Sequence, residues 1–427
     1  MRRHIFAEAD YQQVCSMSKN SRMTLLEWLD ACPTPFHVAA QASSELTSAG
    51  FTSVTQLGYE IPQTGFLAVD GSIVAWRLGS SSSSLRIIGA HSDSPNLRVL
   101  PNADIYQHGW SQLAVEMYGG LLLNSWLDRD LGIAGRVIDA NGKVHLFSDS
   151  TALARIPQLA IHLDRDVNEK GVQLDKHQHM TPVWGSDSQK FSEWLTKTSG
   201  VDHIAAYDAH LFDITPAALL GHDKSLLASG RLDDQVSCWS AINALCDSAS
   251  SEFTTMIVLN DHEEVGSSSS TGAAGPMLSS VIDCISQQHG LSTGQHFDRI
   301  ASSWCLSADN AHAIHPNYPE RHEPSHAPHI NEGPAVKVNA NQRYATSTRG
   351  LAHIQNVAKS NDIPLQVFAS RNNIPCGSTI GPITATQLGI ETIDVGVPQL
   401  SMHSAREMCG AHDPSYLVEL MKAFLQS

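Results

Sequence analysis

Five histidine or acidic side chains, far apart in the sequence, are of the types that a two-metal centre needs: His91, Asp233, Glu264, Asp309 and His403. A hydrolytic pair of ions about 3.5–4 Å apart requires one bridging carboxylate, terminal His and carboxylate ligands, and open positions for water. Two histidines, two aspartates and one glutamate meet this requirement. Nitrogen and oxygen ligands without a thiolate favour Zn²⁺, Co²⁺ or Mn²⁺ over an iron–sulfur centre.

A further carboxylate, Glu263, stands directly before Glu264. Neighbouring residues at the end of a strand point in different directions, so one glutamate can bind metal while the other stays free. A free glutamate beside a metal can act as a general base. Asp93, two residues after His91, is a candidate acceptor for the ring N–H that faces away from the metal, which would fix the tautomer.

Four apolar runs with the character of strands must position most of these residues. The runs at 85–90, 255–259, 304–306 and 392–397 precede His91, the Glu263–Glu264 pair, Asp309 and His403, respectively. Asp233 instead precedes a helical pattern of apolar residues. In open α/β sheets the functional crevice lies beyond the carboxyl ends of the strands, so we expect these side chains to converge there.

The remaining elements suggest how the chain is divided. Thr34 as N-cap, Pro35 at the first position and Gly50 as a stop predict a helix over 34–50. Between about 95 and 230 the sequence is rich in turns, with strand signals near Val137 and at 144–147 and little helical periodicity before residue 188. We interpret this stretch as a β-rich insertion. The predicted division is 1–94, 95–230 and 231–427.

Composition excludes several classes of partner. The 427 residues carry 27 Lys and Arg against 43 Asp and Glu, a net charge of −16 that argues against nucleic acid. No segment approaches the roughly 20 apolar residues of a membrane span, so we expect no membrane partner. Eight cysteines without a C-x-x-C pair favour a reducing compartment, and we expect a cytoplasmic protein. Met17 and Met23 leave open whether residues 1–16 belong to the mature chain.

Three further motifs match the sequence patterns of other functional sites only superficially. His322–His326 satisfies H-E-x-x-H, but Pro324 inside it forbids the helix on which that zinc motif depends. Cys376 has no identifiable activating base and is expected in a glycine-rich turn near the cleft. Gly266–Gly275 lacks both phosphate-binding patterns.

Six segments can now be taken together: Ala90–Pro95, Arg231–Asp233, Glu263–Ser267, Ser307–Asp309, Lys337–Tyr344 and Met402–Ser404. This set, in this order, resembles the aspartyl aminopeptidase family, the M18 class of di-zinc metallopeptidases. The resemblance runs from about Pro35 to the C-terminus.

The resemblance implies two Zn²⁺ per subunit, with a role for each residue. Asp233 would bridge the ions, His91 and Asp309 would complete one site, and Glu264 and His403 the other. Glu263 would be the general base and Asp93 the partner that orients His91. Asp234 stands where the family often has asparagine, so which of the two aspartates bridges stays open.

The resemblance also implies a fold and an assembly. We expect an α/β catalytic domain with a mixed sheet, interrupted by an inserted β-rich dimerisation domain. The expected homo-oligomer is a tetrahedral dodecamer with interior active sites. His162 matches a histidine that family members place in the active site of a neighbouring subunit.

The implied reaction removes N-terminal Asp or Glu from a peptide. Because a chain of charge −16 repels acidic substrates at long range, local cations must outweigh that field. Lys337 is the candidate for the substrate side chain, with His162 or Arg343 as helpers. Two alternatives stay open: a di-metal exopeptidase or amidase of neutral specificity, and a metal-binding scaffold, against which the free Glu263 argues. The native metal and the physiological peptides are also open.

Overall fold

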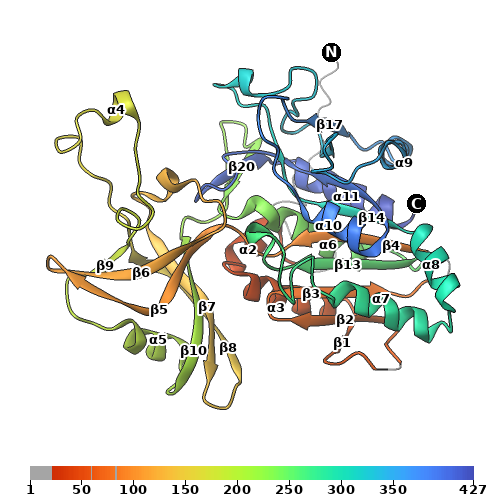
Figure 1. Cartoon of the computed structure of the whole chain (residues 1–427), viewed down its shortest axis with the longest axis horizontal. Coiled ribbons are helices and arrows are strands. Elements are labelled where there is room, and N and C mark those ends of the chain that lie inside the picture. Colours follow the sequence, from red (N-terminus) through yellow and green to blue (C-terminus); the bar gives the residue numbers. More distant parts are fainter. Residues whose placement is uncertain (1–21, 59, 82–83) are drawn as a thin grey trace.

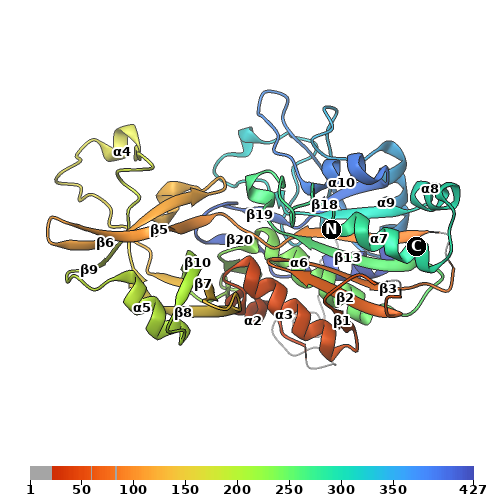
Figure 2. The same ribbon diagram turned by 60° about the horizontal axis from the view of Figure 1, so that its bottom comes forward.

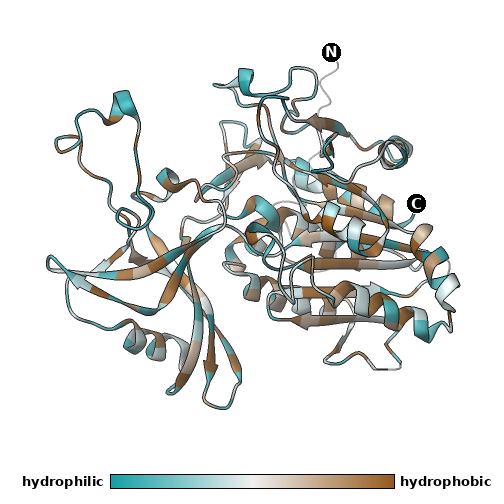
Figure 3. Cartoon of the chain, viewed as in Figure 1, coloured by the Kyte–Doolittle hydropathy of each residue, from teal (hydrophilic) through white to brown (hydrophobic). Residues whose placement is uncertain are grey.

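The computed structural model describes residues 22–58, 60–81 and 84–427, so the question about residues 1–16 lies outside it. Figure 1 shows a larger α/β body beside a smaller body built mainly of strands. In Figure 3 the apolar residues concentrate in the strands of both bodies, whereas α4 (Val167–Lys170) is hydrophilic. None of the helices in the described part of the chain has the length and apolarity to cross a lipid bilayer.

The larger body is organised around a nine-stranded mixed sheet in the order β1-β2-β3-β13-β4-β14-β18-β16-β17. Its strands are β1 (Thr52–Val54), β2 (Thr64–Val69), β3 (Ser72–Arg77), β4 (Leu85–His91), β13 (Thr254–Asn260), β14 (Trp304–Ala308), β16 (Ala335–Val338), β17 (Gln366–Ala369) and β18 (Glu391–Gly396). The central strands β13, β4, β14 and β18 are mutually parallel. The four strands predicted before the candidate ligands are thereby confirmed, and they read as unbroken apolar runs because both sheet faces are covered.

Helices pack on both faces of this sheet (Figures 1 and 2). Alternate residues of β4 show the division, since Ile88 belongs to one hydrophobic cluster and Ile87 to the other. The first face carries α2 (Leu25–Ala31), α3 (Pro35–Ser48), α6 (Leu232–Asp247), α9 (Thr348–Ser360) and α11 (Asp413–Leu425). The second carries α7 (Met277–Gln288), α8 (Thr293–Ala301) and α10 (Ile380–Leu388). Truncating such buried aliphatic side chains costs about 2–5 kcal/mol each.

The helix predicted over 34–50 is confirmed as α3, with Pro35 in its first turn. Thr34 is the N-cap residue of this helix, as predicted. The Thr34 side chain caps no helix N–H, and its Oγ1 lies 2.8 Å from Nδ1 of His37 instead. Gly50, with φ +86°, stands just beyond the end of the helix.

The smaller body is an antiparallel six-stranded sheet in the order β8-β7-β10-β5-β6-β9. Its strands are β5 (Asn96–Gln107), β6 (Trp110–Tyr118), β7 (Leu131–Asp139), β8 (Val144–Ala154), β9 (Val183–Gly185) and β10 (Ile204–Asp213). α5 (Phe191–Ser199) packs on this sheet through Phe191, Trp194 and Leu195. The protein is therefore a mixed α/β fold with a β-rich insert.

A third, five-stranded sheet completes the fold, in the order β11-β12-β20-β19-β15. Its strands are β11 (Ala218–Leu220), β12 (Leu226–Ser229), β15 (Ala311–His312), β19 (Pro398–Leu400) and β20 (Glu407–Gly410). The 3₁₀ turns η1 (Leu123–Trp126) and η3 (Pro319–Arg321) each lie between two strands, and η2 (Glu263–Val265) lies between β13 and α7. β12 leads into α6, and β19 and β20 flank His403.

Charged contacts join the insert to the larger body. Arg136 of β7 pairs with Asp70 in the β2–β3 turn and, at 2.8 Å, with Asp208 of β10. Its guanidinium also lies 4.1 Å from the centroid of the Phe36 ring on α3. A planar cation that meets a carboxylate and an aromatic face together holds the two bodies in register.

A half-buried histidine, His37, and a buried one, His210, lie near this junction and predict a loss of stability in acid. Burial lowers the pKa of His37 to about 4 and that of His210 to about 3. In the unfolded chain both protonate near the ordinary value of about 6.5, so stability is lost as the pH falls from there toward the folded pKa. At pH 5 the expected loss is about 2 kcal/mol per histidine.

The measurement is the unfolding temperature at pH 7 and pH 5 for the wild type and for His210→Gln. The variant should show a smaller drop between the two pH values. An identical drop in both proteins would rule out His210 as a source of the acid sensitivity.

Candidate metal centre

The carboxyl edge of the large sheet gathers the chemistry-bearing side chains. His91 ends β4, and Asp309 follows β14, its parallel neighbour. Glu263 and Glu264 lie in η2 after β13, while Asp233 lies in the first turn of α6. His403 lies in the loop between β19 and β20. The convergence expected from the strand ends therefore occurs, and the α6 terminus and the β19–β20 loop close the cluster from the side of the third sheet.

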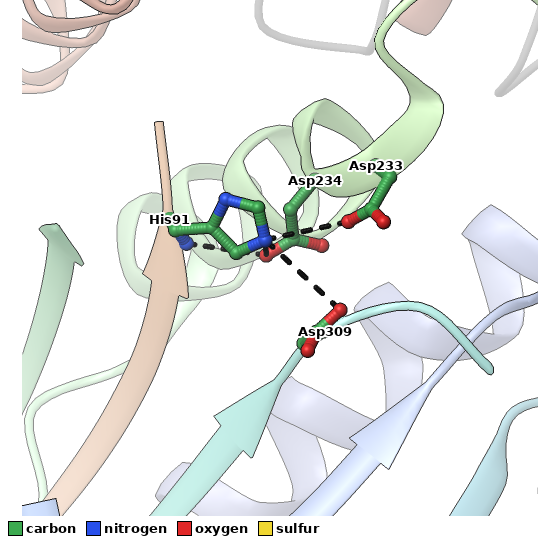
Figure 4. A group of neighbouring side chains, drawn as sticks. All are labelled: His91, Asp233, Asp234 and Asp309. Carbon is green, nitrogen blue, oxygen red and sulfur yellow. Dashed lines mark hydrogen bonds and ion pairs between the residues drawn. The ribbon is translucent and has the colours of Figure 1, made fainter. Parts of the chain in front are cut away.

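Asp233 lies between the two histidines. Its Oδ1 is 3.3 Å from Nε2 of His91, and its Oδ2 is 3.4 Å from Nε2 of His403. His91 Nε2 is also 4.0 Å from Asp309 Oδ1 (Figure 4), and His403 Nε2 is 3.4 Å from Glu264 Oε1. Ligand atoms about 2.0–2.1 Å from a tetrahedral zinc ion lie about 3.3 Å from one another. These separations fit two cation positions that share one carboxylate.

Asp234 occupies a different place. Its Oδ2 accepts the backbone N–H of His91 at 3.2 Å and lies 4.0 Å from that residue's Nε2 (Figure 4). Asp233, by contrast, faces both imidazoles. The geometry thus favours Asp233 for the bridge, with Asp234 close enough to contribute to the His91 side.

Several oxygens of this cluster are buried without a hydrogen-bond donor among the described residues: Asp233 Oδ1, Asp234 Oδ1 and Glu264 Oε1. Buried polar atoms are normally hydrogen-bonded, and an unpaired buried carboxylate is strongly unfavourable. Oxygens left over in this way, next to imidazole nitrogens, suit a divalent cation. The residues present therefore fit a zinc centre.

The electrostatics point the same way. Burial opposes protonation of both imidazoles, but the surrounding carboxylates outweigh it, so the pKa of His91 lies well above its usual value and that of His403 rises to about 10. Asp234 and Asp233 act mainly on His91, and Asp233 and Glu264 on His403. A negative potential that holds protons on imidazoles also attracts metal ions.

Asp93 anchors the glutamate pair. Its carboxylate accepts the backbone N–H groups of Glu263 and Glu264 at 3.0 and 3.1 Å and the hydroxyl of Tyr118 at 2.8 Å. The ring Nδ1 of His91 lies 3.0 Å from the Asp93 backbone carbonyl and 3.4 Å from its Oδ1. The expected contact with the His91 ring is present, although the backbone oxygen is the nearer acceptor. Burial raises the pKa of Glu263 to about 7, the range in which a general base is effective.

Sequence reasoning missed the groups that hold His403. Its Nδ1 lies 3.0 Å from the Gly120 carbonyl, and its own carbonyl accepts the N–H of Leu122 at 3.0 Å. Glu407 accepts the backbone N–H groups of both Asp233 and His403. A carboxylate four residues after His403 was the one local signal. The contacts from the insert come from a segment more than 280 residues away, which no local pattern can reveal.

The three candidate substrate residues differ in position. Lys337 is buried, with its Nζ 3.5 Å from Asp309 Oδ2 and 3.2 Å from the Asn310 carbonyl. Arg343 is exposed and lines a polar pocket of about 440 Å³ formed with residues 370–376. His162 is exposed in the segment just before α4, and Figure 1 shows α4 away from the large sheet. Of these three residues, Lys337 is the one that contacts the candidate metal ligands of its own chain.

The H-E-x-x-H sequence at 322–326 does not form a helix. η3 ends at Arg321, and His326 Nδ1 lies 2.6 Å from the Glu323 carboxylate rather than beside His322 on a shared helical face. The helix on which that zinc motif depends is therefore absent, as Pro324 predicts. Cys376 packs near Tyr344 in a loop, as a partly buried neighbour of a small hydrophobic cluster.

Comparisons with known proteins agree with this centre. Residues 28–425 match the family model described as aminopeptidase I zinc metalloprotease (M18). A probable M18 family aminopeptidase 2 from Streptomyces coelicolor is 45% identical over 417 residues, covering 94% of this chain and 96% of the relative.

Solved structures show the same likeness. A chain in the cryo-EM structure of the Ape4 and Nbr1 complex matches with a TM-score of 0.88 and 34% identity, covering 94% of this chain and 84% of that one. The mApe1 dodecamer of S. cerevisiae matches with a TM-score of 0.82 and 27% identity over 94% and 95% of the two chains. The resemblance expected from the six sequence segments is confirmed, and this zinc-dependent aminopeptidase belongs to the M18 family.

Proposed function

We propose that the protein removes N-terminal aspartate or glutamate from peptides, using two zinc ions per subunit. The main support for two ions is the position of the Asp233 carboxylate. Its two oxygens face two different imidazoles, those of His91 and His403. His91 and Asp309 would hold one ion, Glu264 and His403 the other, and Asp233 both. Co²⁺ or Mn²⁺ would suit the same donors. Bound here, the ions would polarise the scissile carbonyl and lower the pKa of a water molecule.

The chain's own residues would move the proton. Glu263 takes a proton from the attacking water and delivers it to the leaving amine. Its near-neutral pKa supports this role, because the group can both accept and release a proton at the working pH. The Asp93 carboxylate, through the backbone N–H of Glu263, keeps the base in place beside His91.

Lys337 would recognise the acidic side chain. It is a buried cation, its side chain only 2% exposed, next to a proposed metal ligand. A buried ammonium offers a carboxylate far more attraction than an exposed one, because water screens it less. This local charge would counter the repulsion from a chain of net charge −16.

We further propose a homo-oligomer, a tetrahedral dodecamer, in which segments 1–94 and 231–427 form the catalytic domain and 95–230 the dimerisation domain. His162 of one subunit would then reach the centre of another. Exposed apolar side chains flank it in the insert loop, with Leu159 59% and Leu163 75% exposed, as expected of a contact surface. All seven cysteines among the described residues are free, which supports a reducing, cytoplasmic location.

Two adjacent glutamates test the assignment of the base. Glu263→Gln should keep the wild-type metal content and lose about 10²–10⁴-fold in kcat, because a general base is removed. Glu264→Gln should lower the metal content, because a ligand is weakened. Elemental analysis and kcat on an N-terminal Asp substrate are measured side by side. Loss of metal in Glu263→Gln would make Glu263 a ligand and contradict its role as base.

Lys337→Met tests the specificity. The expected result is a fall in kcat/KM for an N-terminal Asp substrate of about 10- to 100-fold or more, since a charge-assisted contact is worth about 1.5–3 kcal/mol or above when buried. Activity on the matching Leu substrate should fall much less. Lys359→Met, an exposed lysine at the end of α9, is the matched control. An unchanged Asp-to-Leu ratio would point to a neutral exopeptidase instead.

Complementation between subunits tests the role of His162. His162→Ala and Glu263→Gln should each be weak alone, whereas co-expressed mixed assemblies should regain activity, because an intact base then meets an intact histidine from another subunit. His179→Ala, in the same exposed loop, serves as control. Full activity of His162→Ala alone would remove this histidine from the active site.

A further inference from the structure

Glu407, the first residue of β20, is buried next to the metal centre without belonging to it. Its side chain is only 1% exposed. Oε2 accepts the backbone N–H of Asp233 at 2.9 Å, and Oε1 accepts the backbone N–H of His403 at 2.7 Å. One carboxylate therefore binds the backbones of two proposed ligands that are 170 residues apart in the sequence.

We propose that Glu407 is a positioning residue that sets the distance between the bridging carboxylate and His403, and thereby the affinity of the centre for its second metal ion. The inference rests on the ligand roles in the proposed function. It adds a residue that touches neither metal nor substrate and acts through the backbone of two ligands.

Both partners need an external hydrogen-bond acceptor. Asp233 has φ −83° and ψ 106°, outside the helical range, in the first turn of α6, where backbone N–H groups lack partners within the helix. His403 has φ +65°, a conformation that is unfavourable for a residue with a Cβ and persists only where its surroundings hold it. Glu407 supplies an acceptor to each.

The third sheet holds Glu407 itself in register. β20 pairs with β12 so that Glu407 lies opposite Ser229, four residues before Asp233. Gln399 of β19 adds a side-chain amide 3.5 Å from Oε1. The strand before Asp233 and the loop that carries His403 are thus tied to the same side chain.

The chemistry requires a carboxylate and not merely a polar group. Both partners are N–H donors, and the two oxygens of a carboxyl group offer an acceptor to each. A glutamine in the same place would present its NH₂ group to one of the two backbone N–H groups. One ligand would then lose its acceptor, with almost no change in side-chain volume.

Glu407→Gln is the test, carried out on the full-length protein. Zinc affinity is measured by competition with a chromophoric chelator, and the visible spectrum of the Co²⁺-substituted protein reports ligand geometry. We expect the second ion to bind about 10–100-fold more weakly, as for other partners that orient metal ligands, with a changed cobalt spectrum. Glu391→Gln is the matched control: it replaces a half-buried glutamate at the start of β18 that accepts a hydrogen bond from Ser347.

Wild-type zinc affinity and an unchanged cobalt spectrum in Glu407→Gln would overturn the inference. If that variant fails to fold, Glu407→Asp is tested in its place. We expect it to bind the second ion more weakly, and unchanged binding would again overturn the inference. Because metal binding is the readout, a wild type that binds two ions but does not prefer acidic substrates refutes only the proposed specificity. A wild type that cannot bind two ions refutes both proposals.

Discussion

Negative charge confined to a buried volume is the constraint on which this structure depends. Five carboxylates surround two imidazoles at the edge of the large sheet, and several of their oxygens have no donor among the described residues. Burying unpaired charges opposes folding by several kcal/mol per ion unless a counter-charge is present. Divalent cations remove that penalty, so metal binding and stability of the native state are linked.

All three sheets contribute residues that position this cluster. The parallel strands β4, β13 and β14 end at the same edge and supply His91, the glutamates of η2 and Asp309. The third sheet positions Asp233 and the His403 loop. Because no single element carries the centre, its geometry is a property of how the sheets pack against one another.

The insert takes part in the centre as well as extending the molecule. Tyr118 at the end of β6 donates to Asp93, and the segment after it holds His403 through Gly120 and Leu122. A shift of the insert against the larger body would therefore move one proposed ligand and the support of the base together. Arg136, paired with Asp70 and stacked on Phe36, resists such a shift.

The sequence by itself determined the parts that depend on local pattern. The strands around the centre are buried on both faces, so they appear as unbroken apolar runs, and β4, β13 and β14 end at or just before residues able to bind metal. The family, the main candidate ligands and helix α3 could be read in this way. Tertiary structure alone decided what depends on contacts between distant segments: that Asp233 rather than Asp234 faces both histidines, that Glu407 ties the His403 loop to Asp233, and that the Gly120 carbonyl holds the His403 ring. The reason is physical, because a side chain that bonds a group brought near it by sheet packing leaves no periodic trace in the sequence.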